Sequence, residues 1–245
     1  MSEIISKATI KRLINDIKQL DDDPLQNIFY RHHQSNMLEG AALIIGPSDT
    51  PYAGGYYLFH FKFPTDYPHS PPIVKYKTND GLTRMHPNLY KSGKVCLSIL
   101  NTWPGEPWTG CQTISSVLLT IQSILTNNPL LHEPGITSTH SDFKKYSEII
   151  RFKNISLSML SIVNNSINLS DDYDDLLNIA KKDFIKNFDS KITIYNDSLN
   201  KWNLFNASSN LIETNIYKIS CKINYTSINE LMYLIKEKLL LIDII

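Results

Sequence analysis

Residues 86–100 read HPNLYKSGKVCLSIL and place a rigid turn, an amide side chain and a thiol in one short segment. Pro87 fixes its own φ angle and disfavours the helical region for His86, so an ordered, non-helical strip is expected here. In such a strip the amide of Asn88 is expected to point toward whatever group Cys96 carries. Because a cysteine thiolate is an acyl-transfer nucleophile, this strip is the first candidate for an active site.

The composition favours a soluble protein that acts on other proteins. The chain has 245 residues, of which 42% are hydrophobic and 20% charged, enough for one domain of about 150 residues and an appendage. Lys plus Arg and Asp plus Glu both total 24, so no overall field attracts the chain to nucleic acid or acidic lipid. We therefore expect protein partners, with neither nucleic acid nor membrane among them.

The cysteines and the chain ends indicate a reducing compartment. Cys96, Cys111 and Cys221 form no Cys-x-x-Cys pair and are odd in number, so they cannot make a closed disulfide framework. No basic segment followed by an apolar one opens the chain, and the apolar tail at 231–245 is too short to span a bilayer. We expect a cytoplasmic protein, with the nucleus as a second location, and a packed amphipathic helix at the tail.

The first 80 residues predict a helix followed by an antiparallel meander. Apolar residues recur at helical spacing before Asp21-Asp22-Asp23-Pro24 ends the pattern; they are Ile10, Leu13, Ile14, Ile17 and Leu20. Four runs rich in β-formers follow at residues 28–31, 41–45, 56–63 and 73–77, separated by glycine and proline. These runs predict four sequential strands of one sheet.

The rest of the chain predicts helices. One helix begins near Thr113 and stops before Pro129, and another begins near Ser141 with a pattern that blurs toward Ser156. A polar stretch at 163–165 then precedes an α-rich extension. In that extension we expect a helix capped by Ser170, a strand over 217–225 and a last helix with a Ser227/Glu230 capping box. We therefore divide the chain into a core at 1–163 and an extension at 164–245, with an α+β fold.

A set of short motifs follows in a fixed order and spacing over about residues 5–160: Gly46-Pro47, Thr50-Pro51-Tyr52, Gly54-Gly55, Phe63-Pro64, Tyr67-Pro68, Pro71-Pro72, His86-Pro87-Asn88, Gly93, Cys96-Leu97, Trp108 and Ile114-Ser115-x-Val117-Leu118-Leu119. In the order and spacing of these motifs the sequence resembles the ubiquitin-conjugating enzyme family. Three further segments, 100–108, 122–126 and 133–135, resemble one branch of this family. That branch implies an alternative activating enzyme and leaves open a modifier other than ubiquitin.

The resemblance implies a carrier enzyme that needs no cofactor or metal of its own, because the upstream activating enzyme uses the ATP. Cys96 would take ubiquitin or a ubiquitin-like modifier as a thioester and pass it to a substrate lysine or a ligase. At pH 7 only about one lysine amine in 2,500 is neutral, so desolvation of the incoming lysine would help this step. Asn88 has two open interpretations: it stabilises the tetrahedral oxyanion, or it only holds the loop.

Other site residues also follow from the resemblance. His86 and Pro87 are loop-structural residues. The acid that many family members place beyond the second helix is missing or displaced at 129–133, which leaves His132 as a candidate helper in lysine discharge. Residues matched to contact surfaces are Lys11 and Arg12 for the activating enzyme, and Pro68, His69, Trp108 and Gly110 for the ligase.

Two other functions are compatible with parts of the sequence. One is a non-catalytic variant of the same fold that binds ubiquitin or scaffolds a ligase; the altered stretches Leu131-His132 and Gly110-Cys111 favour it, whereas Cys96 argues against it. The other is a cysteine protease, which would need His86 and Cys96 to converge on one cleft. The family motifs favour the carrier enzyme over both.

Overall fold

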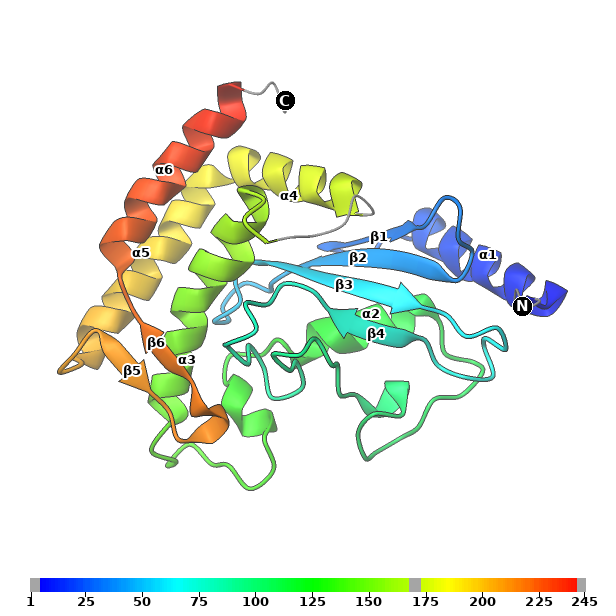
Figure 1. Cartoon of the computed structure of the whole chain (residues 1–245), viewed down its shortest axis with the longest axis horizontal. Helices are drawn as coiled ribbons and strands as arrows, with labels where there is room; N and C mark the ends of the chain where they lie inside the picture. Colours follow the sequence, from blue (N-terminus) through cyan, green and yellow to red (C-terminus); the bar gives the residue numbers. More distant parts are fainter. Residues whose placement is uncertain (1–4, 168–172, 242–245) are drawn as a thin grey trace.

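A four-stranded antiparallel sheet forms the centre of the molecule (Figure 1). The structure is a computed structural model and describes residues 5–167 and 173–241. The strands, in the order β1-β2-β3-β4, are β1 (Ile28–His32), β2 (Glu39–Ile45), β3 (Tyr56–Lys62) and β4 (Ile73–Tyr76). This order confirms the predicted meander, which followed from four runs of β-forming residues and the glycines and prolines between them.

Two helices of the core lie together on one side of the sheet. Helix α1 (Lys7–Asp22) contacts α2 (Ile114–Ile124), and α2 contacts β2. Thr113 precedes α2 and forms a capping box with Ser116, so the predicted start near Thr113 is confirmed. The face predicted for α1 is partly wrong, because Ile14 is 49% exposed while Asp16 is buried. Asp16 is turned inward because it accepts hydrogen bonds from Arg12 and from the Tyr67 hydroxyl.

The apolar spacing of the helix predicted from Ser141 becomes irregular toward Ser156 for a structural reason. Helix α3 (Phe143–Lys153) continues into a π-helical segment, η3 (Asn154–Ser161), whose wider turns break the 3.6-residue spacing of apolar side chains. The buried Asn154 of this segment accepts a 2.6 Å hydrogen bond from the Tyr57 hydroxyl and donates one of 2.9 Å to the Ala53 carbonyl. The segment therefore ties the helix to the turn before β3.

The described helices of the extension each pack against an element of the core. Its elements are α4 (Asp174–Lys186), α5 (Phe188–Phe205), β5 (Leu211–Glu213), β6 (Ser220–Lys222) and α6 (Tyr225–Leu241). Helix α4 contacts β1, α5 contacts α3, and α6 contacts η3. In Figure 1 α5 and α6 lie at one end of the sheet beside α3, while α1 lies at the other end. The division of the chain at residue 163 stays a prediction, since one apolar core runs through both parts.

Three details of the extension differ from the sequence prediction. The strand expected over 217–225 is shortened to β6, because Tyr217 lies in a 3-10 turn and Tyr225 begins α6. The Ser227/Glu230 capping box is wrong: the Ser227 N–H donates to the Asn224 side chain, so Asn224 caps α6. The cap expected at Ser170 falls outside the described residues.

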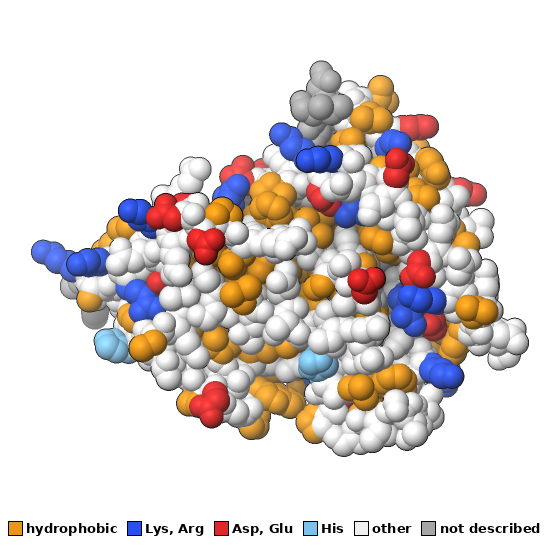
Figure 2. Space-filling view, turned by 180° about the vertical axis from the view of Figure 1, so that it is seen from behind, with side chains coloured by type: hydrophobic (Ala, Val, Ile, Leu, Met, Phe, Trp, Pro, Cys, Tyr) orange, Lys and Arg blue, Asp and Glu red, His pale blue; other side chains and the backbone are white. Residues whose placement is uncertain are grey.

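The surface agrees with the balanced composition. On the face shown in Figure 2, acidic and basic side chains are interspersed among apolar ones. Within residues 5–167 and 173–241, no helix is both long and apolar enough to cross a bilayer.

Candidate active site

Asn88 and Cys96 face each other across a short antiparallel bridge. The Cys96 N–H donates to the Asn88 carbonyl at 2.9 Å, and the Asn88 side-chain Nδ2 donates to the Cys96 carbonyl at 2.6 Å. Leu89 and Val95 pair next to them. The structure therefore brings together the two residues to which the resemblance assigns catalysis.

A tight turn between these residues makes the bridge possible. The Gly93 N–H donates to the Tyr90 carbonyl at 2.9 Å, and the Tyr90 N–H donates to the Lys94 carbonyl at 3.0 Å. Gly93 has φ +85°, and a Cβ there would lie 2.9 Å from the Tyr76 carbonyl oxygen. Glycine is needed here both for its backbone conformation and for the close approach of β4.

Cys96 is almost fully covered in the free chain, with 1% of its surface exposed, and Asn88 is 8% exposed. Thr102, which the sequence motifs did not identify, holds the residues on both sides of Cys96. The Thr102 hydroxyl donates to the Val95 carbonyl at 2.9 Å and accepts from the Leu97 N–H at 2.9 Å. A reagent could reach Cys96 only if its side chain, or the residues around it, moved.

His86 is built into the loop. The ring is completely buried, its Nδ1 accepts the Asn88 N–H at 3.0 Å, and it lies 4.8 Å from the ring of His132. Burial lowers the pKa of His86 well below its usual value of 6.5, and the neighbouring His132 and Arg84 lower it further. These contacts fit the loop-structural role and leave Nδ1 occupied by the backbone, unlike the base of a protease.

The buried His86 predicts a loss of stability in mild acid. An unfolded histidine takes up a proton below about pH 6.5, whereas folded His86 stays neutral, so the unfolded chain binds more protons there. The contribution of His86 to the free energy of unfolding should be constant above about pH 6.5 and fall below it, by up to about 1.4 kcal/mol per pH unit.

Urea unfolding from pH 7.5 to 5.0 measures this dependence. His86→Asn should be less stable at pH 7.5 but should lose less stability on acidification than the wild type. His69→Gln, at an exposed histidine, is the control and should keep the wild-type slope. Equal slopes for His86→Asn and wild type would contradict the assignment.

His132 lies beside His86, as a discharge helper near this strip would need. Its Nε2 is 3.0 Å from the Thr126 hydroxyl, and partial burial lowers its pKa from 6.5. The neutral form, which can accept a proton, is thus favoured at pH 7. The following residue, Glu133, is engaged elsewhere: its Oε2 accepts from the Tyr217 hydroxyl.

The residues matched to partner contacts form a connected region. The Trp108 Nε1 donates to the Pro68 carbonyl at 2.8 Å, while His69 and Gly110 are exposed nearby in the chain. Lys11 is exposed, but Arg12 is engaged within the chain. Its guanidinium bonds to Asp16 at 2.8 Å, to the Gly110 carbonyl at 2.6 Å and to the Gln112 carbonyl. Arg12 thus joins α1 to the segment after Trp108, and its assignment to the activating enzyme stays a prediction.

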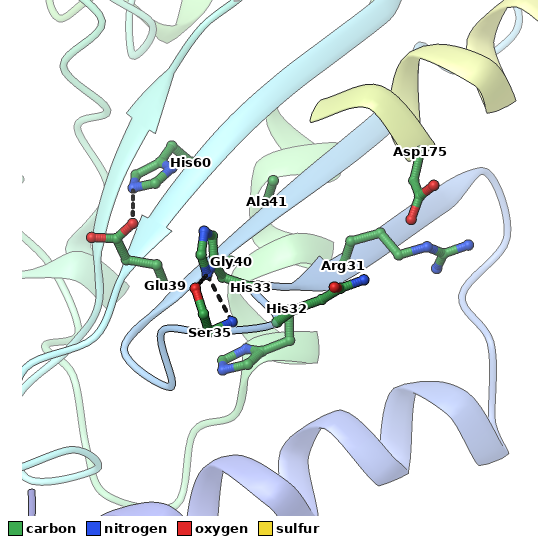
Figure 3. Close-up of a pocket in the computed structure, with 10 residues that line it drawn as sticks. Arg31, His32, His33, Ser35, Glu39, Gly40, Ala41, His60 and Asp175 are labelled. Carbon is green, nitrogen blue, oxygen red and sulfur yellow. Dashed lines mark hydrogen bonds and ion pairs between the residues drawn. The ribbon is translucent and has the colours of Figure 1, made fainter. Parts of the chain in front are cut away.

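Among the hollows formed by the described residues are a groove and a larger hollow at the sheet. A groove of about 260 Å³ runs between β4 and the Cys96 segment and is lined by residues that include Pro72, Val95, Leu100 and Thr102. A hollow of about 480 Å³ lies where β1, β2 and β3 meet the start of α4 (Figure 3). It contains histidines, but residues 5–167 and 173–241 include no group of three or more His, Cys, Asp or Glu side chains placed to hold a metal ion.

Comparison with known proteins agrees with this geometry. The profile of the family described as ubiquitin-conjugating enzyme matches residues 12–156. The chain is 40% identical over 191 residues to ubiquitin-conjugating enzyme E2 Z of Xenopus tropicalis, covering 77% of this chain and 60% of that protein. It is 40% identical over 181 residues to human E2 Z, covering 73% and 50%.

A human dual E2 ubiquitin-conjugating enzyme/E3 ubiquitin-protein ligase is also 40% identical, over 178 residues, which cover 65% of this chain and 4% of that protein. For the two E2 Z relatives, the match with this chain spans about half to three fifths of their length. The branch that the segments at 100–108, 122–126 and 133–135 resemble is conjugating enzyme Z, and the comparisons confirm this similarity. The chain belongs to the ubiquitin-conjugating enzyme family.

Proposed function

We propose that this chain accepts ubiquitin or a ubiquitin-like modifier on Cys96 and transfers it to a substrate lysine or to a ligase. The observation that carries the proposal is the pairing of Cys96 with Asn88, whose Nδ2 lies 2.6 Å from the Cys96 carbonyl oxygen. An acyl carrier needs a thiol nucleophile and a nearby donor for the oxyanion, and this pair supplies both. Its partners would be an activating enzyme that uses ATP, the modifier, a ligase and substrates, in the cytoplasm or nucleus.

Loading is a thioester exchange. The Cys96 thiolate attacks the carbonyl carbon that joins the modifier to the activating enzyme, the new C–S bond forms, and the thiol of the activating enzyme leaves. The groove beside Val95 offers an apolar floor next to this reaction for the extended end of the modifier. Because Cys96 is 1% exposed, docking of the activating enzyme must uncover it.

Discharge needs a neutral amine. The substrate nitrogen attacks the thioester carbonyl, its proton leaves, and the C–S bond breaks to return the Cys96 thiol. Asn88 would donate to the oxyanion, and removing one such donor costs on the order of 3 kcal/mol. His132, whose pKa is lowered by burial, is the candidate acceptor for the proton.

A charging assay tests this function. The full chain is mixed with ATP, with ubiquitin or a relative, and with each of a panel of activating enzymes, and the products are separated on non-reducing gels. We expect an adduct of the chain and modifier that thiol removes. If no combination of activating enzyme and modifier charges the chain, the proposed function is wrong.

The burial of Cys96 favours one alternative, a non-catalytic member of the fold that binds a modifier or scaffolds a ligase. The same assay separates the two. A carrier gives a thiol-sensitive adduct that transfers the modifier to free lysine. Binding of the modifier without an adduct, or charging without any lysine discharge, would favour the alternative.

A further inference from the structure

The side chain of Arg84 lies at the junction of three separate parts of the chain. Its guanidinium carbon lies 3.6 Å from the centre of the Tyr90 ring and 4.2 Å from that of the Tyr217 ring. Its Nη2 lies 3.9 Å from the Glu133 Oε2, which also accepts a hydrogen bond from the Tyr217 hydroxyl at 2.5 Å. We refer to Arg84, Tyr90, Glu133 and Tyr217 as the Arg84 cluster.

The Arg84 cluster is bonded directly to the active-site strip. The Arg84 Nε donates to the Pro87 carbonyl at 3.1 Å, and its Nη2 donates to the same oxygen. Pro87 stands between His86 and Asn88. A planar guanidinium held between two aromatic rings has little freedom, so it fixes the carbonyl to which it is bonded. The position of Asn88 therefore depends on Arg84.

The cluster also reaches the segment that carries His132. Glu133 follows His132 directly, and its Oε2 faces both the Tyr217 hydroxyl and the Arg84 guanidinium. With that oxygen engaged, the acidic residue next to His132 serves as an anchor for the segment. The two sides of the proposed discharge site, Asn88 and His132, are thus each one residue from an atom that the cluster holds.

Tyr217 is the contribution of the extension to this cluster, and the chain holds it in an uncommon conformation. Its φ is +59° and that of Lys218 is +51°, in the left-handed region that a tyrosine rarely adopts. Asp142 at the start of α3 accepts the N–H groups of Asn215 at 2.8 Å and Ile216 at 2.9 Å, which fixes the turn before Tyr217. Such strain persists only where surrounding contacts over-determine it, and it is concentrated at functional sites.

We propose that Tyr217 is a positioning residue through which the extension holds Asn88 and His132 in place for discharge of the modifier. It touches neither the thiol nor the reacting atoms; it acts through Arg84 and Glu133. This inference rests on the proposed function, and it gives the extension a role in the transfer step. Figure 1 shows the β5–β6 hairpin, which brings Tyr217 to the core, beside one end of α3.

The first test compares charging and discharge in single turnovers. Tyr217→Ala removes both the ring and the hydroxyl, and should slow discharge to free lysine about tenfold. The reason is that the partly buried Arg84 guanidinium loses one of its two stacked rings and the Glu133 carboxylate loses a hydrogen bond. Tyr217→Phe keeps the ring and should restore most of that rate. Charging should stay within about twofold of the wild type in both variants, because Cys96 itself is untouched.

Lys222→Ala is the matched control, since Lys222 is exposed on the same hairpin. It should charge and discharge as the wild type does. Discharge at the wild-type rate in Tyr217→Ala would overturn the inference. So would charging and discharge that fall together in all Tyr217 variants, because the residue would then only support the fold.

Amide hydrogen exchange of the uncharged chain is the second test, and it does not depend on the modifier. In Tyr217→Ala, exchange at residues 84–90 should become at least about tenfold faster, while exchange in β2 stays unchanged. Unchanged exchange at 84–90 would overturn the inference even if the chain charges normally. If exchange at 84–90 is faster in Tyr217→Ala but the wild-type chain never charges, the positioning role is supported and only the proposed function is rejected.

Discussion

Replacing Asn88 with alanine is expected to slow discharge of the loaded chain about 100-fold or more, while charging of Cys96 stays within about twofold. The amide nitrogen of asparagine carries two N–H donors, of which one is used on the Cys96 carbonyl at 2.6 Å. The other is the donor that we assign to the oxyanion. Discharge of preloaded chain to free lysine, followed in a single turnover, measures the effect.

The same variant separates the two interpretations of Asn88. Loss of the hydrogen bond to the buried Cys96 carbonyl should lower the free energy of unfolding by about 1–3 kcal/mol, and circular dichroism checks that the variant is folded. Asn88→Asp is the control, because it keeps the shape and replaces the donor by an acceptor; its discharge should be at least as slow as that of the alanine variant. Normal discharge in folded Asn88→Ala would remove the oxyanion role and leave only the loop-holding one.

Replacing Gly46 with alanine is expected to destabilise the fold by about 3 kcal/mol or more. A Cβ at this position would lie 1.8 Å from the backbone carbonyl oxygen of Tyr52. The backbone there cannot retreat, because the Gly46 N–H donates to the Gly55 carbonyl at 2.8 Å and the Gly46 carbonyl accepts the Gly54 N–H at 3.0 Å. Urea unfolding of the variant and wild type measures the difference.

Gly110→Ala provides a matched control for that substitution. The nearest atom to a Cβ at Gly110 is the Pro68 carbonyl oxygen at 3.7 Å, an ordinary contact, so stability should change by no more than about 0.5 kcal/mol. If Gly46→Ala and Gly110→Ala were equally stable, the close approach of the turn to Tyr52 would not be the reason for glycine at 46.

The four strands of the sheet and the start of α2 could be predicted because their signals are local. The runs of β-forming residues, the glycines and prolines between them and the apolar spacing after Thr113 each depend on a few adjacent residues. The inward face of α1 could not be predicted in the same way, because Asp16 is buried only where Tyr67 meets it. The π-helical segment from Asn154 likewise depends on a tertiary contact, the hydrogen bond from Tyr57.

The candidate site likewise contains residues that the sequence identified and residues that it did not. The family motif identified Cys96, Asn88 and His86, since these residues share one strip of sequence. It did not identify Thr102, Arg84 or Tyr217. Thr102 and Arg84 donate to backbone carbonyls seven and three residues away, and no sequence motif marks such bonds. Tyr217 meets Arg84 only when the extension folds onto the core. Arg84 lies two residues before His86, but no local pattern shows that its guanidinium bonds to Pro87 and stacks on a tyrosine of the extension.

The chemical stability of the modifier adduct in three single variants tests whether Cys96 carries the modifier. The structure leaves Cys96, Cys111 and Cys221 all as free thiols. We predict that Cys111→Ser and Cys221→Ser form an adduct that thiol removes, as the wild type does. Cys96→Ser should form only an adduct that resists thiol, because the serine alkoxide of an oxyester is a poorer leaving group than the thiolate of a thioester. A thiol-sensitive adduct on Cys96→Ser would contradict the account, because the modifier would then be carried elsewhere.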